Sequence, residues 1–277
     1  MRPPYVIMVA PNGARRTKLD HPALPITESE IVEAVAQSKD AGAHAAHVHV
    51  RDADGDHVLD AELYSSLIRA LQARCGQDFI IQITTEAIGR YSPQQQRALI
   101  DDVRPQAVSI ALRELFADPN ENATNRAFLH WAREQNIAIQ WIVYSTEEIG
   151  TLASLIDEGI VPSGPNPMLF VLGRYTRGQQ CDPLDIIPYL RAREEHSALQ
   201  NENWSICAFG SAETACLTTA LTLGGDVRVG FENSLWNPDG SQARCNAERV
   251  HDINYIANEL GLPRATCAQA RRVLAIT

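Results

Sequence analysis

Residues 44–50 read HAAHVHV and set two histidines, His47 and His49, one residue apart in a run of small and β-branched residues. Such a run is typical of a buried strand, and side chains alternate between the two faces of a strand. The two imidazoles therefore share one face, and apolar side chains occupy the other. A strand of this kind must pack its apolar face against further elements of the fold.

Similar apolar runs recur along the chain and alternate with segments of helical periodicity. The runs are YVIMVA (5–10), HAAHVHV (44–50), FIIQIT (79–84), AVSIAL (107–112), AIQWIVY (138–144), MLFVLG (168–173), WSICAFG (204–210) and DVRVGFE (226–232). Helix start signals stand between them, such as Thr27 with Glu30 three residues later, and Ser92 followed by Pro93. Eight strand–helix repeats predict an α/β fold, a (β/α)8 TIM barrel with residues 1–277 as a single domain. The alternative is an open Rossmann-like sheet with an extra subdomain, but no G-x-G-x-x-G follows the first run.

Composition narrows the class of protein. The chain has 277 residues, 45% of them hydrophobic and 21% charged, as in an ordinary globular protein. Its formal net charge of −10 argues against a nucleic-acid partner, and no stretch approaches the roughly 20 apolar residues of a membrane span. The six cysteines show no C-x-x-C spacing, so we expect reduced thiols in a cytoplasmic protein.

A barrel places its catalytic groups at the C-terminal ends of the strands, on inward-facing side chains. The eighth, first and second strands are neighbours in a closed barrel, so His47, His49 and Glu232 come within reach of one another. Two histidines and a glutamate match a catalytic site for zinc or another divalent metal, with one position open. The alternative is structural: the histidines hydrogen-bond within the core, and Glu232 pairs with Arg228. We favour the metal site, because buried charges are costly unless partnered and several strands bring them together.

The other histidines lack such a pattern. His44 has the opposite parity in its run, and His57 follows DADGD (52–56), which we interpret as a turn rather than a calcium loop. We expect the rest on the surface or in helices: His21, His130, His196 and His251.

Three stretches together resemble one known family. HVHVRD (47–52), RVGFEN (228–233) and the early APNGARRTK (10–18) are similar to the β-keto acid cleavage enzymes, and the similarity extends over most of the chain. The resemblance implies a zinc-dependent barrel that reacts a small β-keto acid with acetyl-CoA to give acetoacetate and a new acyl-CoA. It also implies a homo-oligomer, such as a tetramer.

The resemblance assigns roles to individual residues. By it, His47, His49 and Glu232 bind zinc, which holds the keto and carboxylate oxygens of the substrate and stabilises an enolate. Thr84 and Ser109 match hydroxyl positions that bind substrate. Arg228, a catalytic candidate, matches the arginine that shapes and charges the site.

Some positions depart from the family's pattern. Asn233 replaces an aspartate that serves as the proposed base, and its amide accepts no proton at neutral pH, so we keep it as a substrate-binding candidate. Gln140 and Ile142 occupy the places where a glutamate is expected, and Arg15 replaces another glutamate. These departures predict that a keto acid bearing an amino group is not the preferred substrate.

The catalytic base must then lie elsewhere. Glu86, inward-facing at the end of the third run, is our first candidate, and Glu114 after the fourth run is the second. The alternative for either is a salt bridge to an arginine such as Arg90 or Arg113.

Two basic loops complete the expected site. In NGARRTK (12–18), we expect Asn12 to touch substrate and Arg15 to hold a substrate carboxylate or the phosphates of CoA. The loop LGRYTRGQQ (172–180) suits a lid or a CoA contact. A plain exposed basic surface is the alternative for the first loop.

The leading hypothesis is therefore a zinc-dependent acyltransferase that cleaves a β-keto acid with acetyl-CoA. A second hypothesis is a metal-dependent lyase or hydrolase on the same barrel that uses metal-bound water and no CoA. A third is a metal-holding protein that has lost catalysis. Formation of acetoacetate that depends on acetyl-CoA separates the first two, and any turnover excludes the third.

Overall fold

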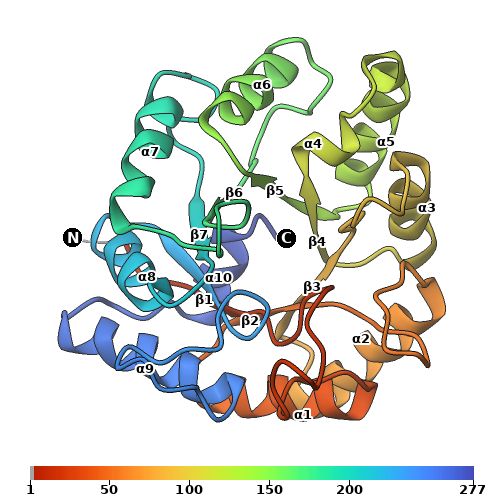
Figure 1. Cartoon of the computed structure of the whole chain (residues 1–277). Coiled ribbons are helices and arrows are strands. Elements are labelled where there is room, and N and C mark those ends of the chain that lie inside the picture. Colours follow the sequence, from red (N-terminus) through yellow and green to blue (C-terminus); the bar gives the residue numbers. More distant parts are fainter. Residues whose placement is uncertain (1–2) are drawn as a thin grey trace.

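The computed structural model describes residues 3–277 and confirms the barrel. In this part of the chain, eight parallel strands pair in sequence order and close between β8 and β1, and helices form a ring around them (Figure 1). The strands are β1 (Ile7–Val9), β2 (Ala45–Val48), β3 (Ile80–Thr84), β4 (Ala107–Ala111), β5 (Ala138–Val143), β6 (Met168–Leu172), β7 (Trp204–Ala208) and β8 (Asp226–Val229). Each lies within one of the predicted apolar runs.

Helices connect the strands at the predicted places. They are α1 (Glu28–Asp40), α2 (Ala61–Cys75), α3 (Pro93–Val103), α4 (Leu112–Leu115), α5 (Asn122–Glu134), α6 (Thr146–Asp157), α7 (Ile186–Glu194), α8 (Glu213–Thr222), α9 (Asn246–Glu259) and α10 (Cys267–Val273), with short 3₁₀ turns at Pro119–Glu121 and Pro183–Asp185. Thr27 and Glu30 form the expected capping box of α1, and Ser92 caps α3 with Pro93 in its first turn. None of the helices in residues 3–277 is both long and apolar enough to cross a membrane.

The alternation of side chains along each strand divides the interior in two. Outward-facing residues such as Val48 and Ile110 pack against the helices in the main hydrophobic core. Inward-facing positions fill the barrel itself, where His47 on β2 stands in register with Gln82 on β3. The polar face predicted for β2 therefore points into the barrel.

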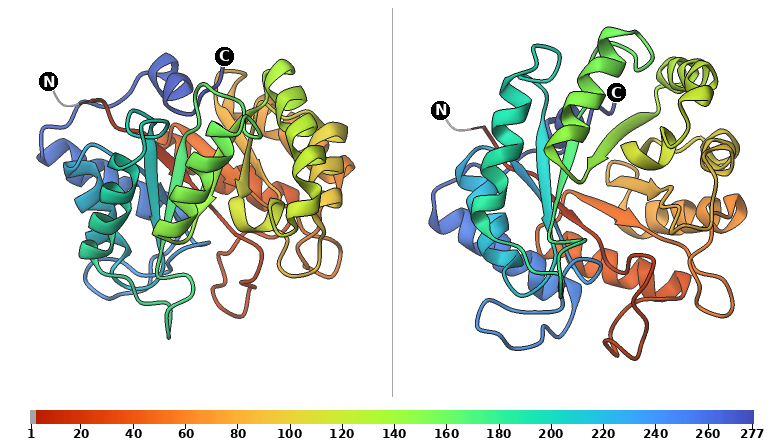
Figure 2. Two further views of the ribbon diagram at one scale, coloured as in Figure 1. Left: turned by 90° about the horizontal axis from the view of Figure 1, so that it is seen from above. Right: turned by 45° about the horizontal axis from the view of Figure 1, so that its top comes forward.

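The two ends of the barrel differ in what closes them. At the N-terminal end, small and apolar inward side chains such as Ala45 and Ile80 pack against α10 and the residues that flank it. Figure 2 shows α10 on one side of the barrel and the long loops after β1, β6 and β8 on the opposite side. These loops surround the C-terminal end, where a barrel carries its functional groups.

The turn after β8 is shaped by a glycine. Gly230 has φ +139°, and a Cβ atom there would lie 2.5 Å from the carbonyl oxygen of Ala10, so a side chain at this position would clash with backbone. Strand β8 ends before it, at Val229, and not at Glu232 as its apolar run suggested. The Glu232 N–H donates to Ala10 O (3.1 Å), which holds the turn against the end of β1.

Candidate metal centre

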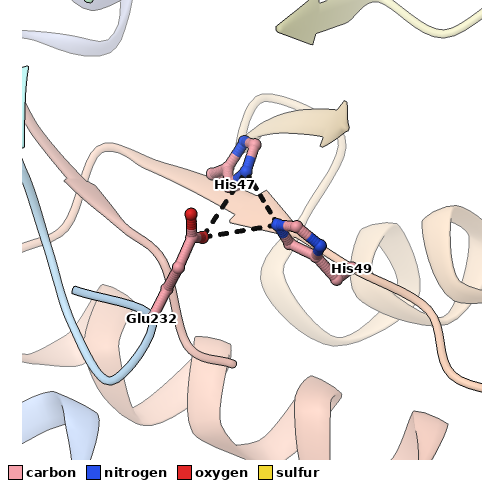
Figure 3. A group of neighbouring side chains, drawn as sticks. All are labelled: His47, His49 and Glu232. Carbon is pink, nitrogen blue, oxygen red and sulfur yellow. Dashed lines mark hydrogen bonds and ion pairs between the residues drawn. The ribbon is translucent and has the colours of Figure 1, made fainter. Parts of the chain in front are cut away.

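Three side chains meet at the C-terminal end of the barrel: His47 on β2, His49 just beyond it, and Glu232 in the turn after β8 (Figure 3). His47 Nε2 lies 3.2 Å from His49 Nε2 and 3.6 Å from Glu232 Oε2. His49 Nε2 lies 3.4 Å from the same oxygen. The structure thus brings the three expected metal ligands into one cluster.

The cluster has the dimensions of a metal site. A tetrahedral zinc ion with bonds of about 2.0–2.1 Å separates its ligand atoms by about 3.3–3.4 Å, close to the edges of this triangle. Glu232 Oε2 is buried and has no hydrogen-bond partner among residues 3–277, so a cation would satisfy it. Two imidazole nitrogens and a carboxylate oxygen suit zinc and other divalent ions. The residues present therefore fit a divalent metal.

A chain of buried hydrogen bonds fixes the tautomer of His47. Ser205 Oγ donates to Met168 O (3.2 Å), and because that carbonyl only accepts, every bond in the chain runs one way. Gln140 Nε2 then donates to Ser205 Oγ and Gln82 Nε2 to Gln140 Oε1, both at 3.0 Å. Gln82 Oε1 is left to accept from His47 Nδ1–H (2.8 Å). His47 Nε2 therefore carries a lone pair toward the triangle, as a metal ligand must.

Burial keeps both histidines in the form that binds metal. Desolvation, followed by the positive charge of Arg228, lowers the pKa of His47 to about 4. Desolvation also lowers the pKa of His49 well below its usual value. Burial, the largest single influence, would raise the pKa of Glu232, but Arg228, whose guanidinium donates to Glu232 Oε1 at 2.8 Å, together with His47 and His49 outweighs it, and the pKa lies well below 4.5. Two neutral imidazoles and one carboxylate face each other.

Glu86 lies next to this cluster. Its Oε2 is 4.0 Å from His49 Nδ1, and its Oε1 is 3.5 Å from a nitrogen of Arg174. Burial, reinforced by the charge of Glu232, raises the pKa of Glu86 to about 7. A carboxyl group that exchanges its proton near neutral pH suits a general base. Its arginine partner is Arg174, from the loop after β6, and neither of the arginines expected from the sequence.

The second candidate base has a structural role. Glu114 Oε2 accepts from the Ala87 N–H and from Gln96 Nε2, both at 2.9 Å, and it is not among the residues that line the cavity. Glu86, in contrast, lines the cavity. The structure therefore favours Glu86 over Glu114.

A cavity of about 280 Å³ opens above the cluster. It is lined by the expected residues Asn12, Arg15, His47, Thr84, Glu86, Ser109, Arg228 and Glu232. The Asn12 Oδ1 and Ser109 Oγ atoms are buried and have no hydrogen-bond partner in the described residues, so both are free to bind a ligand. Asn233 is fully buried and does not line the cavity.

Further residues line the cavity, and some of them lie in the two loops expected at the site. Its further lining residues are Gly13, Ala14, Arg16, Asp20, Ala111, Ile142, Tyr144, Val171, Arg174, Gln179 and Phe209. Arg174 and Gln179 belong to the loop at 172–180 that was expected to act as a lid or a CoA contact. The inward parity of Ile142 and Val171 on their strands was the available signal for the apolar members.

The remaining histidines differ from one another. His57 was set aside, yet its ring centroid lies 5.0 Å from that of His49, and its Nε2 donates to the backbone oxygen of Glu86 (3.1 Å). The DADGD turn, which is confirmed, brings it there by pairing Arg51 with His57. The prediction that His21 lies on the surface or in a helix is wrong. It is buried against Phe231, and its Nε2 donates to Ala243 O (2.8 Å).

A (β/α)8 barrel with titratable side chains gathered around a cavity at its C-terminal end defines this protein as a barrel enzyme. The profile of the β-keto acid cleavage enzyme family matches residues 4–276, and the chain belongs to that family.

Curated relatives align with nearly the full length of the chain. A 3-keto-5-aminohexanoate cleavage enzyme of Acetoanaerobium sticklandii is 26% identical over 279 residues, which is 98% of either chain. A 3-oxoadipate:acetyl-CoA acetyltransferase of Cupriavidus necator is 25% identical over 280 residues, 100% of this chain and 96% of the relative. Relatives of this kind are named as cleavage enzymes and transferases, and the protein is accordingly an acyltransferase-type enzyme.

Solved structures agree on the fold. A binary complex of ObcA with oxaloacetate superposes with a TM-score of 0.73 at 18% identity, covering 92% of this chain and 68% of that one. A type I 3-dehydroquinate dehydratase from Clostridium difficile gives a TM-score of 0.61 at 11% identity, covering 94% and 92%.

Proposed function

We propose that the protein catalyses zinc-dependent cleavage of a small β-keto acid by acetyl-CoA. The β-keto acid R–CO–CH₂–COO⁻ and acetyl-CoA give acetoacetate and R–CO–CoA, so that the CH₂–COO⁻ unit moves to the acetyl group and CoA moves to the R–CO group. The observation that carries the proposal is the triangle of His47 Nε2, His49 Nε2 and Glu232 Oε2, of which His47 and Glu232 line the cavity. The family and the acetyl-CoA named for the Cupriavidus relative support it.

The bound metal ion would supply Lewis-acid polarisation to the substrate oxygens. His47, His49 and Glu232 would hold it, with neutral imidazoles and an ionised carboxylate. Arg228 keeps Glu232 ionised and adds positive charge beside the substrate carboxylate. Glu86 accepts the proton that leaves the carbon between the keto and carboxylate groups.

Other side chains orient the reactants. The free Ser109 Oγ and Asn12 Oδ1 face the cavity, where Thr84 also lies, and they position the keto acid by hydrogen bonds. Arg15, exposed at the rim, meets the phosphates of CoA. Asn233 does not line the cavity, and its buried side-chain amide has no hydrogen-bond partner among residues 3–277, so it stays a candidate whose contact with substrate is not direct in this arrangement. Its main chain holds the turn, since its N–H donates to Gly230 O (2.8 Å).

The test combines metal content with a coupled assay. We expect about one zinc ion per chain by elemental analysis and acetoacetate formation that requires acetyl-CoA. His47→Ala and Glu232→Ala lose both, whereas His44→Ala, which changes a histidine at the other end of the barrel, keeps the metal. Turnover of a keto acid without acetyl-CoA would instead support the lyase or hydrolase. A protein that binds metal and turns over no keto acid would support the metal-holding alternative.

The proposal also covers the domain organisation, the cellular location and the oligomeric state of the protein. We expect residues 1–277 to act as a single barrel domain in the cytoplasm, and the chain to form a homo-oligomer such as a tetramer. Light scattering of the purified protein measures the oligomeric state, and a monomer at micromolar concentration would contradict this expectation.

A further inference from the structure

The mouth of the barrel has two chemically different halves. The polar half comes from the ends of β8, β1, β2 and β3 and contains the metal ligands, Arg228 and Glu86. The other half comes from β4, β5, β6 and β7. Besides Ser109, Arg174 and Gln179, the residues that line the cavity from this half belong to one apolar cluster: Ala111, Ile142, Tyr144, Val171 and Phe209. We call these five residues the apolar wall.

The barrel geometry sets the apolar wall opposite the metal ligands. The strands close in the order β1 to β8, so β5 and β6 lie across the barrel from β1 and β2. Ile142 on β5 and Val171 on β6 are at inward positions of their strands and are nearly buried in the protein alone. A ligand that is held at the metal and extends across the cavity therefore reaches this wall.

The cations nearest the apolar wall already have partners. Arg174 lies over the Phe209 ring, 5.0 Å from its centroid, and pairs with Glu86. Arg113 lies over the Tyr144 ring, 4.5 Å from its centroid, and pairs with Glu148. A charged group placed against the wall would lose its hydration and gain no free counter-ion there.

We infer that the substrate's R group is a short, uncharged alkyl chain that packs against the apolar wall. The inference rests on the proposed function and specifies the substrate class of the same site. In a β-keto acid, the carboxylate and the R group extend from opposite sides of the keto carbon. With the carboxylate held in the polar half, the R group points to β5 and β6.

The chemistry of the wall discriminates among R groups. Each methylene group that is buried there improves binding by about fourfold. An ammonium group would be desolvated and would also meet the positive charge of Arg174. A second carboxylate would have to displace Glu86 from Arg174. The rings of Tyr144 and Phe209, together with the volume of about 280 Å³, limit the chain to a few carbons.

The first experiment titrates the metal-loaded protein with four keto acids, without acetyl-CoA, by calorimetry. The acids are 3-oxopentanoate, 3-oxohexanoate, 3-oxoadipate and 5-amino-3-oxohexanoate. We expect 3-oxohexanoate to bind about fourfold more tightly than 3-oxopentanoate, and at least tenfold more tightly than either acid with a charged R group. Tighter binding of 3-oxoadipate or of the amino acid would overturn the inference.

Two variants locate the effect at the wall. Ile142→Ala should reduce the preference for 3-oxohexanoate over 3-oxopentanoate to about unity, and Val171→Thr should lower it while keeping the side-chain shape. Val143→Ala is the matched control, because Val143 follows Ile142 on β5 but faces the helices in the main core. An unchanged preference in both wall variants, or an equal change in Val143→Ala, would contradict the inference.

Binding and turnover measurements together distinguish a failure of the proposed function from a failure of the assignment of the apolar wall. If 3-oxohexanoate binds best but acetyl-CoA yields no acyl-CoA from any acid, the proposed function fails and the assignment of the wall stands. If acyl-CoA forms most efficiently from a charged acid, the proposed function stands and the assignment of the wall fails.

Discussion

The two ends of the barrel use the same residue types in opposite ways. At the N-terminal end, His44 Nδ1 accepts from the Ile7 N–H (3.0 Å) and its Nε2 donates to Ala265 O (3.1 Å), so both ring nitrogens are satisfied. At the C-terminal end, His49 Nδ1 and Glu232 Oε2 are buried without hydrogen-bond partners among the described residues.

The presence or absence of hydrogen-bond partners distinguishes a buried polar group that stabilises the fold from one that binds a ligand. Buried polar groups are almost always hydrogen-bonded, so unpaired polar atoms in residues beside a cavity indicate that a ligand completes them. Substitution at the N-terminal end should therefore cost stability, and substitution at the C-terminal end should cost binding and activity.

The largest expected effect tests the C-terminal end. His49→Ala removes one of the three candidate ligands, and we expect metal content to fall below 0.1 ion per chain as an order-of-magnitude estimate, and kcat/KM to fall more than about a hundredfold. Elemental analysis and steady-state kinetics measure both. Retention of metal and activity would show that His49 belongs with His44 as a structural histidine.

The next largest effect tests whether the hydrogen bond to Gln82 orients His47 at the C-terminal end of the barrel. Gln82→Leu interrupts the hydrogen-bond chain behind His47, and we expect metal affinity to fall by about 10- to 100-fold. Gln82→Glu is the control, because a carboxylate still accepts from His47 Nδ1–H. Gln140 then turns its amide to donate to the carboxylate, and Ser205 Oγ donates to Gln140 Oε1 instead of to Met168 O. Equal affinity for metal in Gln82→Leu and the parent, measured by competition with a chelator, would contradict the positioning role.

Sequence reasoning predicted the fold and the cluster of candidate metal ligands for physical reasons. The period of two along β2 fixed His47 and His49 on one face, and the strand order of a closed barrel placed Glu232 beside them. Glu232 was found even though β8 ends at Val229, because the backbone after the strand stays bonded to Ala10.

The residues that were missed depend on the paths of loops. His57 reaches the site only because the turn at 52–56 folds back on Arg51. The pairing of Arg174 with Glu86 depends on the loop after β6, whose course no periodicity reports. His21 looked like a surface residue because its packing partner, Phe231, is distant in sequence.

A smaller effect tests the N-terminal end. His44→Ala leaves the Ile7 N–H and the Ala265 carbonyl oxygen without partners in a buried environment, and we expect a loss of about 3 kcal/mol in the free energy of unfolding. Metal content should stay that of the parent. Denaturant unfolding with parallel metal analysis checks both, and loss of metal without loss of stability would reverse the assignment of the two ends.

The smallest effect concerns Asp226, at the start of β8. Its Oδ1 accepts from the Val6 N–H (2.6 Å), and burial raises its pKa to about 7. The folded state therefore holds a proton that the unfolded state releases above a pH of about 4, so this group's contribution to stability decreases as pH rises from about 4 to 7. Asp226→Asn should stabilise the protein by about 1–2 kcal/mol at pH 8 and change little at pH 4. Equal unfolding free energies of variant and parent at pH 8 would show that the carboxyl group ionises in the fold at no cost in stability, and that burial does not raise its pKa.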